Sequence, residues 1–225
     1  MVLSDAAKSG VVIFVGAVQF GVLLIVSEIV YSAYGTYPYS VSANYVSDLG
    51  ATCPSSGACY IPPSALLFDS SIALMGLLIV LGAYFLHRAF NWTPATVFVA
   101  LTGIGALGVG LFPETTGVWH DAFSLIVFLF AGLSAIATYK FQKRPMAYFS
   151  VILGAITLIA LILYVPNIYL GLGPGGMERM IVYPALLWAI GFGAHLMALE
   201  DKAPMQTRQR HSAVSDRSDL QGSKA

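Results

Sequence analysis

The chain has 225 residues, of which 57% are apolar and 10% charged, and its mean hydropathy is +0.78. Eleven Lys and Arg balance eleven Asp and Glu, so the net charge is zero. A soluble domain of this composition would expose too much apolar surface to water, whereas lipid accepts it. The composition therefore excludes a soluble protein.

Membrane lipids are the expected partners, other membrane subunits are an open alternative, and no nucleic-acid partner is expected.

Six apolar runs follow one another along the chain, each almost free of Lys and Arg. They cover residues 10–34, 65–86, 95–112, 119–139, 147–165 and 181–199. Each is about 18–25 residues long, which is enough to cross a hydrocarbon core roughly 30 Å thick. We therefore predict an all-α fold, a six-helix transmembrane bundle that occupies residues 1–200. Residues 201–225 have little apolar content, so we expect a disordered cytoplasmic tail there.

The basic residues predict the orientation of this bundle. When the loops are threaded alternately, ten of the eleven Lys and Arg fall on one side, and Arg179 alone falls on the other. Cytoplasmic loops carry the excess of Lys and Arg. We therefore predict that both termini are cytoplasmic and that the protein crosses the cell membrane, with its long first loop, residues 35–64, outside.

Both cysteines, Cys53 and Cys59, lie in this first loop. Disulfides persist outside the cytoplasm, and a bridge here would close a short loop and restrict the unfolded chain. Two thiolates could instead ligate a metal, although two are too few without further ligands. We predict a disulfide bond between Cys53 and Cys59.

Acidic residues collect on the predicted outer side, opposite the single outer cation, Arg179. They are Glu28, Asp48, Asp69, Glu114, Asp121 and Glu178. Ionisable groups at membrane depth usually face the bundle interior or a water-filled cavity. These carboxylates could therefore line a cation-attracting vestibule, and the alternative is that they are wet interfacial charges or helix caps. Arg179 is a candidate partner for Glu28 or Asp69.

The most chemically suggestive cluster is His120, Asp121 and Ser124, at the outer start of the fourth run. Their spacing places them on one helical face, and they are our candidate catalytic residues. A serine nucleophile also needs a correctly placed base and an oxyanion site, which spacing does not reveal. With Asp48 and Glu114, His120 could instead bind a metal ion. A hydrogen-bonded structural histidine is the simpler alternative.

Two further histidines, His87 and His195, lie near the inner ends of the second and sixth runs. Such a pair could ligate a b-type haem if the two helices faced each other. His87 adjoins Arg88 and fits an inner-interface position better, so no haem is expected.

Three stretches resemble one known family. They are Asn44-Tyr-Val-Ser-Asp-Leu-Gly50, then Leu111-Phe-Pro-Glu114 followed by His120, and Gly175-Gly-Met-Glu178-Arg179 with Tyr183-Pro184 and Trp188. The chain resembles the prokaryotic membrane family catalogued as domain of unknown function 998, which is distantly similar to the Frag/DRAM/Sfk-type membrane proteins. The resemblance implies a six-span bundle but no activity.

The resemblance also bears on the site. It implies a shared pattern of Asn44, Ser47, Asp48, Pro113, His120, Glu178 and Arg179, whereas Asp69 stands where relatives are expected to have an amide. Our candidate ligand-binding residues are Asn44, Ser47, Asp48, Asp69, Glu114, Glu178 and Arg179.

Three functions are consistent with these features. The first is a subunit, scaffold or lipid-contacting module with an outward-facing polar ligand or ion site. The second is an intramembrane metal-assisted or Ser/His hydrolase acting on a lipid or outer-leaflet substrate. The third is a small-solute or cation transporter that uses Glu28 and Asp69. We favour the first, because no complete catalytic constellation can be read from the sequence.

Overall fold

The computed structural model describes residues 3–34, 39–51 and 63–199. The helices in chain order are α1 (Asp5–Tyr34), η1 (Ser47–Gly50), α2 (Pro63–Phe90), α3 (Pro94–Leu111), η2 (Glu114–Thr116), α4 (Val118–Ala137), η3 (Thr138–Phe141), α5 (Met146–Tyr164) and α6 (Gly173–Met197). The six α-helices are each long and apolar enough to cross a membrane, and the described residues contain no strand. The predicted fold class is confirmed.

Two of the predictions concern segments outside the described residues. The Cys53–Cys59 disulfide and the tail at 201–225 both belong to them, so each stays a prediction. The boundary of the membrane domain at residue 200 stays a prediction for the same reason.

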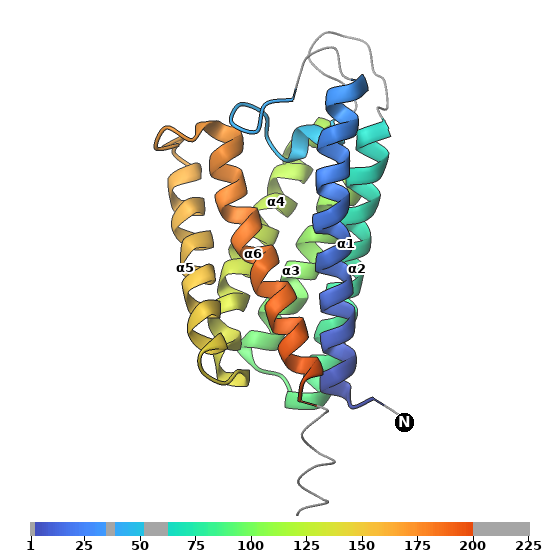
Figure 1. Ribbon diagram of the computed structural model, residues 1–225, viewed down its shortest axis with the longest axis vertical. Coiled ribbons are helices and arrows are strands. Elements are labelled where there is room, and N and C mark those ends of the chain that lie inside the picture. Colours follow the sequence, from blue (N-terminus) through green and yellow to red (C-terminus); the bar gives the residue numbers. More distant parts are fainter. Residues whose placement is uncertain (1–2, 35–38, 52–62, 200–225) are drawn as a thin grey trace, which may run out of the picture.

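The six α-helices run up and down in succession around the bundle, so that α1 begins and α6 ends at the same end (Figure 1). Each helix packs on the next, and α6 packs back on α1, whereas α4 and α6 touch each other only sparsely. We call the end that carries residues 39–51, η2 and the start of α6 the loop end. The opposite end is the terminal end.

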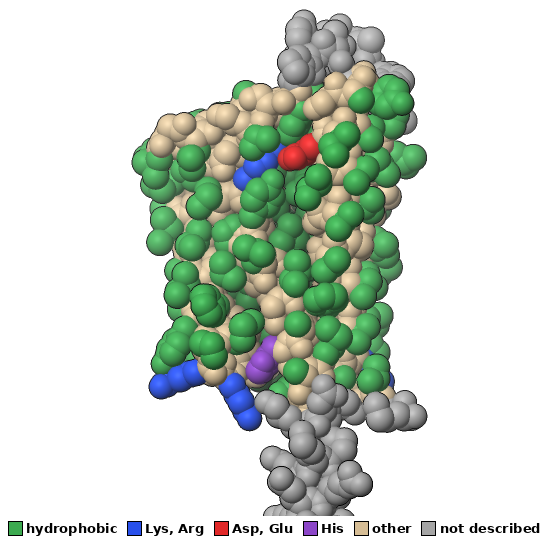
Figure 2. Space-filling view, in the orientation of Figure 1, with side chains coloured by type: hydrophobic (Ala, Val, Ile, Leu, Met, Phe, Trp, Pro, Cys, Tyr) green, Lys and Arg blue, Asp and Glu red, His purple; other side chains and the backbone are tan. Residues whose placement is uncertain are grey.

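The charges of the described residues separate along this axis. The basic residues at the terminal end are Lys8, Arg88, Lys140, Lys143 and Arg144. Arg179 is the one basic residue at the loop end among the described ranges. Figure 2 shows basic side chains at the lower end of one face and apolar side chains over its middle. The terminal end is thus the one expected in the cytoplasm, and this orientation stays a prediction.

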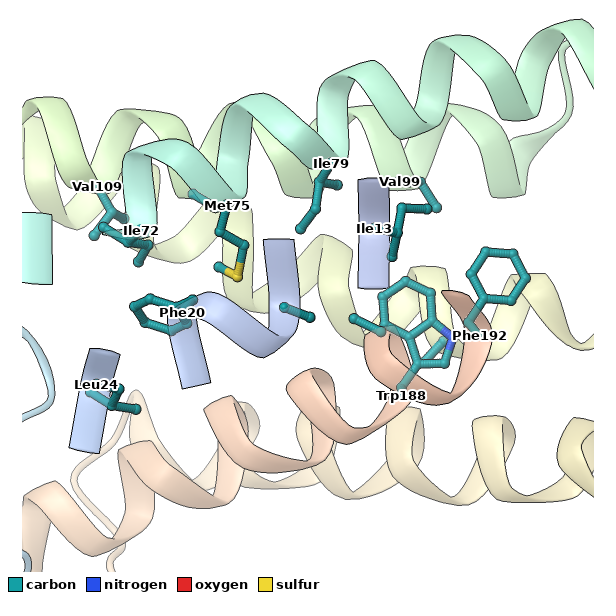
Figure 3. Close-up of a cluster of buried hydrophobic side chains, with 14 of the residues drawn as sticks. Ile13, Phe20, Leu24, Ile72, Met75, Ile79, Val99, Val109, Trp188 and Phe192 are labelled. Atoms are coloured by element: carbon teal, nitrogen blue, oxygen red, sulfur yellow. The ribbon is translucent and has the colours of Figure 1, made fainter. Parts of the chain in front are cut away.

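Helix α1 packs between α2 and α6 and contributes one face to the apolar core. Its Ile13, Phe20 and Leu24 are fully buried. Figure 3 shows Phe20 opposite Ile72 and Met75 of α2. Large apolar side chains on the outer faces of the helices are exposed, as expected for surfaces that meet lipid.

Helices α2 and α3 approach closely because glycines remove the side chains between them. A Cβ added to Gly76 would lie 2.2 Å from the backbone nitrogen of Leu107 and 2.7 Å from the carbonyl oxygen of Gly103. Such small residues let helices in membranes pack backbone against backbone. The contact fixes one wall of the bundle interior.

We predict that Gly76→Ala destabilises the protein by about 1–3 kcal/mol, because the added methyl group forces α2 and α3 apart. Gly21→Ala is the matched control, since a Cβ there meets nothing within 4 Å. Alanine favours a helix over glycine, so this control should be neutral or slightly stabilising. Thermal unfolding of the detergent-purified proteins, followed by circular dichroism, measures both. Equal melting temperatures would contradict the tight α2–α3 contact.

Candidate functional site

Arg179 of α6 connects three segments at the loop end. Its Nη1 donates to the carbonyl oxygens of Val41 at 3.1 Å, Asn44 at 3.0 Å and Gly175 at 3.0 Å. Its Nη2 donates to Glu28 Oε1 of α1 at 2.7 Å and to the Tyr39 hydroxyl. The side chain of Arg179 is only 4% exposed. Of the two predicted candidate partners, Glu28 and Asp69, it is Glu28 that pairs with Arg179.

Tyr39 extends this network into the loop. Its hydroxyl donates to the carbonyl oxygen of Tyr45 at 3.2 Å, and its ring lies under the Arg179 guanidinium. Burial raises the pKa of Tyr39 well above its usual range. The phenol therefore stays neutral and remains a donor to Tyr45 at physiological pH.

The loop segment Asn44–Gly50 is folded by its own polar groups. Asp48 Oδ2 accepts from Asn44 Nδ2 and from the Tyr45 backbone N–H, both at 2.9 Å. The Val46 N–H donates to Glu178 Oε2 of α6 at 2.6 Å. Asn44 and Asp48, which we predicted to bind a ligand, are thus engaged in holding the loop against α6.

A polar cavity of about 280 Å³ lies beside this loop, between η2, α4, α5 and α6. Its polar lining consists of Tyr45, Ser47, Glu114, His120, Asp121, Ser124, Tyr164 and Glu178. The structure therefore gathers six of the predicted site residues around one space. Asn44, Asp48, Asp69 and Arg179 do not line it.

His120 is oriented by a single hydrogen bond. Its Nδ1 lies 2.9 Å from the carbonyl oxygen of Phe112. A carbonyl oxygen can only accept, so Nδ1 carries a proton and donates it to the Phe112 carbonyl oxygen. His120 is only 5% exposed, and no described residue donates to its Nε2. The hydrogen bonds among the described residues do not link His120 to Ser124 or Asp121.

A second, apolar cavity of about 70 Å³ adjoins the polar one and extends into the bundle. Both cavities are lined by Ser47, His120, Ser124, Phe128 and Glu178. Along α6 the apolar cavity extends from Glu178 to Ala189, about 16 Å at the rise of a helix. Side chains of α1, α2, α3, α4 and α6 form its walls.

The apolar cavity ends near the ring of Trp188. The Trp188 indole donates to Thr138 Oγ1 at 3.1 Å and stacks on Phe192 (Figure 3). Beyond this point Leu86, Val99 and Leu196 fill the terminal end and are completely buried. The two cavities therefore adjoin one another at the five residues they share, and we call the pair the hollow, which is polar at the loop end and apolar in the core.

The hollow is acidic. Among the described residues, no Lys or Arg lines either cavity, whereas Glu114, Asp121 and Glu178 do. Glu114 Oε2 is buried without a hydrogen-bond partner among the described residues. Burial, and then the nearby Asp48 carboxylate, raise the pKa of Glu114 to about 7. The polar cavity thus offers acceptors and negative charge without a compensating cation.

The metal prediction receives no support from the geometry. Within residues 3–34, 39–51 and 63–199, no group of three or more His, Cys, Asp or Glu could hold a metal ion. Binding by His120, Asp48 and Glu114 therefore stays a prediction of the sequence alone.

Three other candidates lie away from the hollow. Asp69 of α2 is placed against Gly50, where an added Cβ would lie 2.2 Å from Asp69 Oδ1. His87 stacks on Trp92, with ring centroids 4.1 Å apart. His195 Nε2 lies 3.2 Å from the carbonyl oxygen of Phe141.

Sequence reasoning missed two sets of residues. Tyr45 and Tyr164 both line the polar cavity, although neither is among the predicted site residues. The apolar wall was also missed, because residues such as Phe20 and Met75 are ordinary core residues in sequence. The sequence signal that indicates the polar cavity is the placement of several carboxylates near Ser124 and His120.

A model of the family described as Protein of unknown function (DUF998) matches residues 19–195. The match runs from α1 to the last turn of α6 and so includes every residue that lines the two cavities. No curated protein and no solved structure matches the chain.

We predict that Arg179→Lys destabilises the protein by roughly 3 kcal/mol or more, because an ammonium cannot replace the five contacts of the guanidinium and Glu28 loses its partner. Arg144→Lys is the matched control, since Arg144 is exposed at the terminal end. Thermal unfolding measures both, and limited proteolysis within residues 39–51 reports whether the loop is released. A resistant loop in Arg179→Lys would contradict the anchoring role.

A second prediction concerns pH. The pKa of Glu114 is higher in the folded protein than in the unfolded chain, so its protonation favours folding. The free energy of unfolding therefore decreases as the pH rises from 4.5, the ordinary pKa of a glutamate, to about 7. We therefore expect Glu114→Gln to be more stable than the wild type by about 1–2 kcal/mol near pH 8, after solvent screening is considered. Below about pH 5 the difference should vanish.

Melting temperatures measured between these pH values test this expectation. Glu114→Asp is the control, because it retains a titrating carboxyl and should keep the trend of the wild type. A Glu114→Gln difference that is independent of pH would show that Glu114 does not titrate in this range.

Proposed function

Since this chain belongs to the family described as Protein of unknown function (DUF998), which supplies no activity, we propose that it is an integral membrane protein that binds an amphiphilic lipid within its bundle. The apolar tail would occupy the apolar cavity, and the polar head would occupy the polar cavity. This proposal narrows the function favoured from the sequence, a subunit, scaffold or lipid-contacting module, to a lipid-binding one, and it assigns the ligand site to the hollow.

One observation carries the proposal: the polar and the apolar cavity share five lining residues and so adjoin one another. Ligand sites are typically apolar clefts with a few polar groups that fix orientation. Here the polar groups gather at one end, so the hollow has the polarity of an amphiphile. A small polar solute would leave the apolar part empty, and a hydrocarbon would leave the buried carboxyl oxygen of Glu114 without a partner.

The polar cavity also adjoins the lipid-facing surface between α4 and α5. Its lining includes Leu125 of α4 and Val165 after α5, both exposed. Nearer the terminal end the same two helices are in backbone contact, since a Cβ on Gly154 would lie 2.7 Å from the Gly132 carbonyl oxygen. A lipid could therefore enter sideways from the bilayer at the loop end.

A second candidate is hydrolysis of the bound lipid. It is favoured by the orientation of His120, whose Nδ1 donates to the Phe112 carbonyl oxygen, while Ser124 lies one turn further along α4 and lines the same cavity. Release of fatty acid from lipids added to the wild type, absent in Ser124→Ala and in His120→Gln, would support it. Transport through Glu28 receives less support, because Glu28 is paired with Arg179 and lines neither cavity.

We predict that an amphiphile with a terminally brominated dodecyl chain quenches the fluorescence of Trp188, because its tail would reach the end of the apolar cavity. The protein carries Trp92→Phe and Trp119→Phe, which leave Trp188 as the single indole. It is reconstituted in nanodiscs of unbrominated phosphatidylcholine. Trp188 is only 3% exposed, so probe in the surrounding bilayer should not reach it.

Ala185→Phe should abolish this quenching, because the ring fills the apolar cavity from the side of α6. Leu187→Phe places the same ring on the exposed face two residues away and should leave the quenching unchanged. Ala131→Leu on α4 provides a second blocking variant if Ala185→Phe does not fold. Quenching that survives both blocking variants, or that never occurs, would refute the proposed lipid site.

A further inference from the structure

We infer that the ligand of this hollow is a single-chain amphiphile with a protonated amine as its head group. The inference rests on the proposed function and names the chemical class of the lipid. It follows from the charge of the polar cavity, from the unpaired acceptors within it and from the width of the apolar cavity.

The charge of the lining selects a cation. Glu114, Asp121 and Glu178 approach the polar cavity from η2, α4 and α6. The nearest guanidinium, that of Arg179, is turned to Glu28, Tyr39 and three carbonyl oxygens. An anionic head group would find no cation in this lining, whereas an ammonium could pair with the carboxyl groups and stabilise their ionised form.

The hydrogen-bonding capacity of the buried groups points the same way. Glu178 is only 4% exposed and receives one N–H, from Val46, at a single oxygen. Glu114 Oε2 is buried without a hydrogen-bond partner among the described residues. Buried acceptors without donors are costly. An ammonium supplies three donors and no acceptor, so it satisfies these groups without adding another.

The apolar cavity limits the tail to one chain. Its volume of about 70 Å³ is a quarter of the roughly 280 Å³ of the polar cavity, although it extends about 16 Å along α6. The cavity is therefore narrow, and five helices surround it, so that even one alkyl chain could enter only by displacing side chains of the lining. A lipid with two acyl chains would have to leave one of them outside the hollow.

The test compares three probes that share one tail and differ in the charge of the head: bromododecylamine, bromododecanol and bromododecyl sulfate. Quenching of Trp188 is measured in the single-indole protein in phosphatidylcholine nanodiscs. A second protein that retains only Trp119, which is exposed, reports how much of each probe enters the bilayer. After this correction we expect the amine to bind at least tenfold more tightly than the alcohol, and the sulfate to bind most weakly.

Variants assign the preference to the cavity. Glu178→Gln keeps an acceptor for the Val46 N–H but removes the charge, and it should reduce the preference for the amine to threefold or less. Asp121→Asn at the exposed edge of the cavity tests the same point if Glu178→Gln does not fold. Asp5→Asn removes a carboxylate at the terminal end, far from the cavity, and should leave the preference intact.

The possible results separate the two proposals. Equal quenching by all three probes, or strongest quenching by the sulfate, overturns the inference but leaves the lipid site standing. Quenching by none of them overturns the proposed function itself. A preference for the amine that Glu178→Gln and Asp121→Asn both leave unchanged would place the recognition of charge outside this cavity, and it too overturns the inference.

Discussion

The buried guanidinium of Arg179 is the interaction on which the loop end depends. A charge inside an apolar bundle is costly unless it is paired and its hydrogen-bonding groups are satisfied. One chain segment cannot supply enough acceptors, so they come from α1, from residues 39–44 and from α6 itself. The carbonyl oxygens of Val41 and Asn44 can reach Arg179 only when the loop folds down onto the start of α6.

The folded loop in turn shapes the hollow. Once Asn44 is fixed, Asp48 closes the turn, and the Val46 N–H meets Glu178 at the junction of the two cavities. Tyr45 and Ser47 then contribute to the lining. A residue that lines neither cavity therefore sets the position of several that do.

The sequence predicted the bundle well because its signals are physical requirements of a bilayer. Long apolar runs must be helical, and the two ends differ in charge before any contact is known. Asn44 and Asp48 form hydrogen bonds within the loop itself, and their binding of a ligand stays a prediction. A polar group that binds a ligand and one that binds its neighbour look alike in sequence. The hollow could not be predicted at all. It depends on how α4, α5 and α6 pack, and residues such as Phe20 and Trp188 are equally compatible with a filled core.

The position of Trp188 at the end of the apolar cavity determines how a lipid bound there, as proposed, could leave it. The hollow begins at the loop end, and the indole, anchored on Thr138 and backed by Phe192, closes it in the core. Within the described residues, the apolar cavity is thus closed toward the terminal end. Under the proposed function, a lipid that enters from one leaflet would leave by the same opening, into the leaflet from which it came.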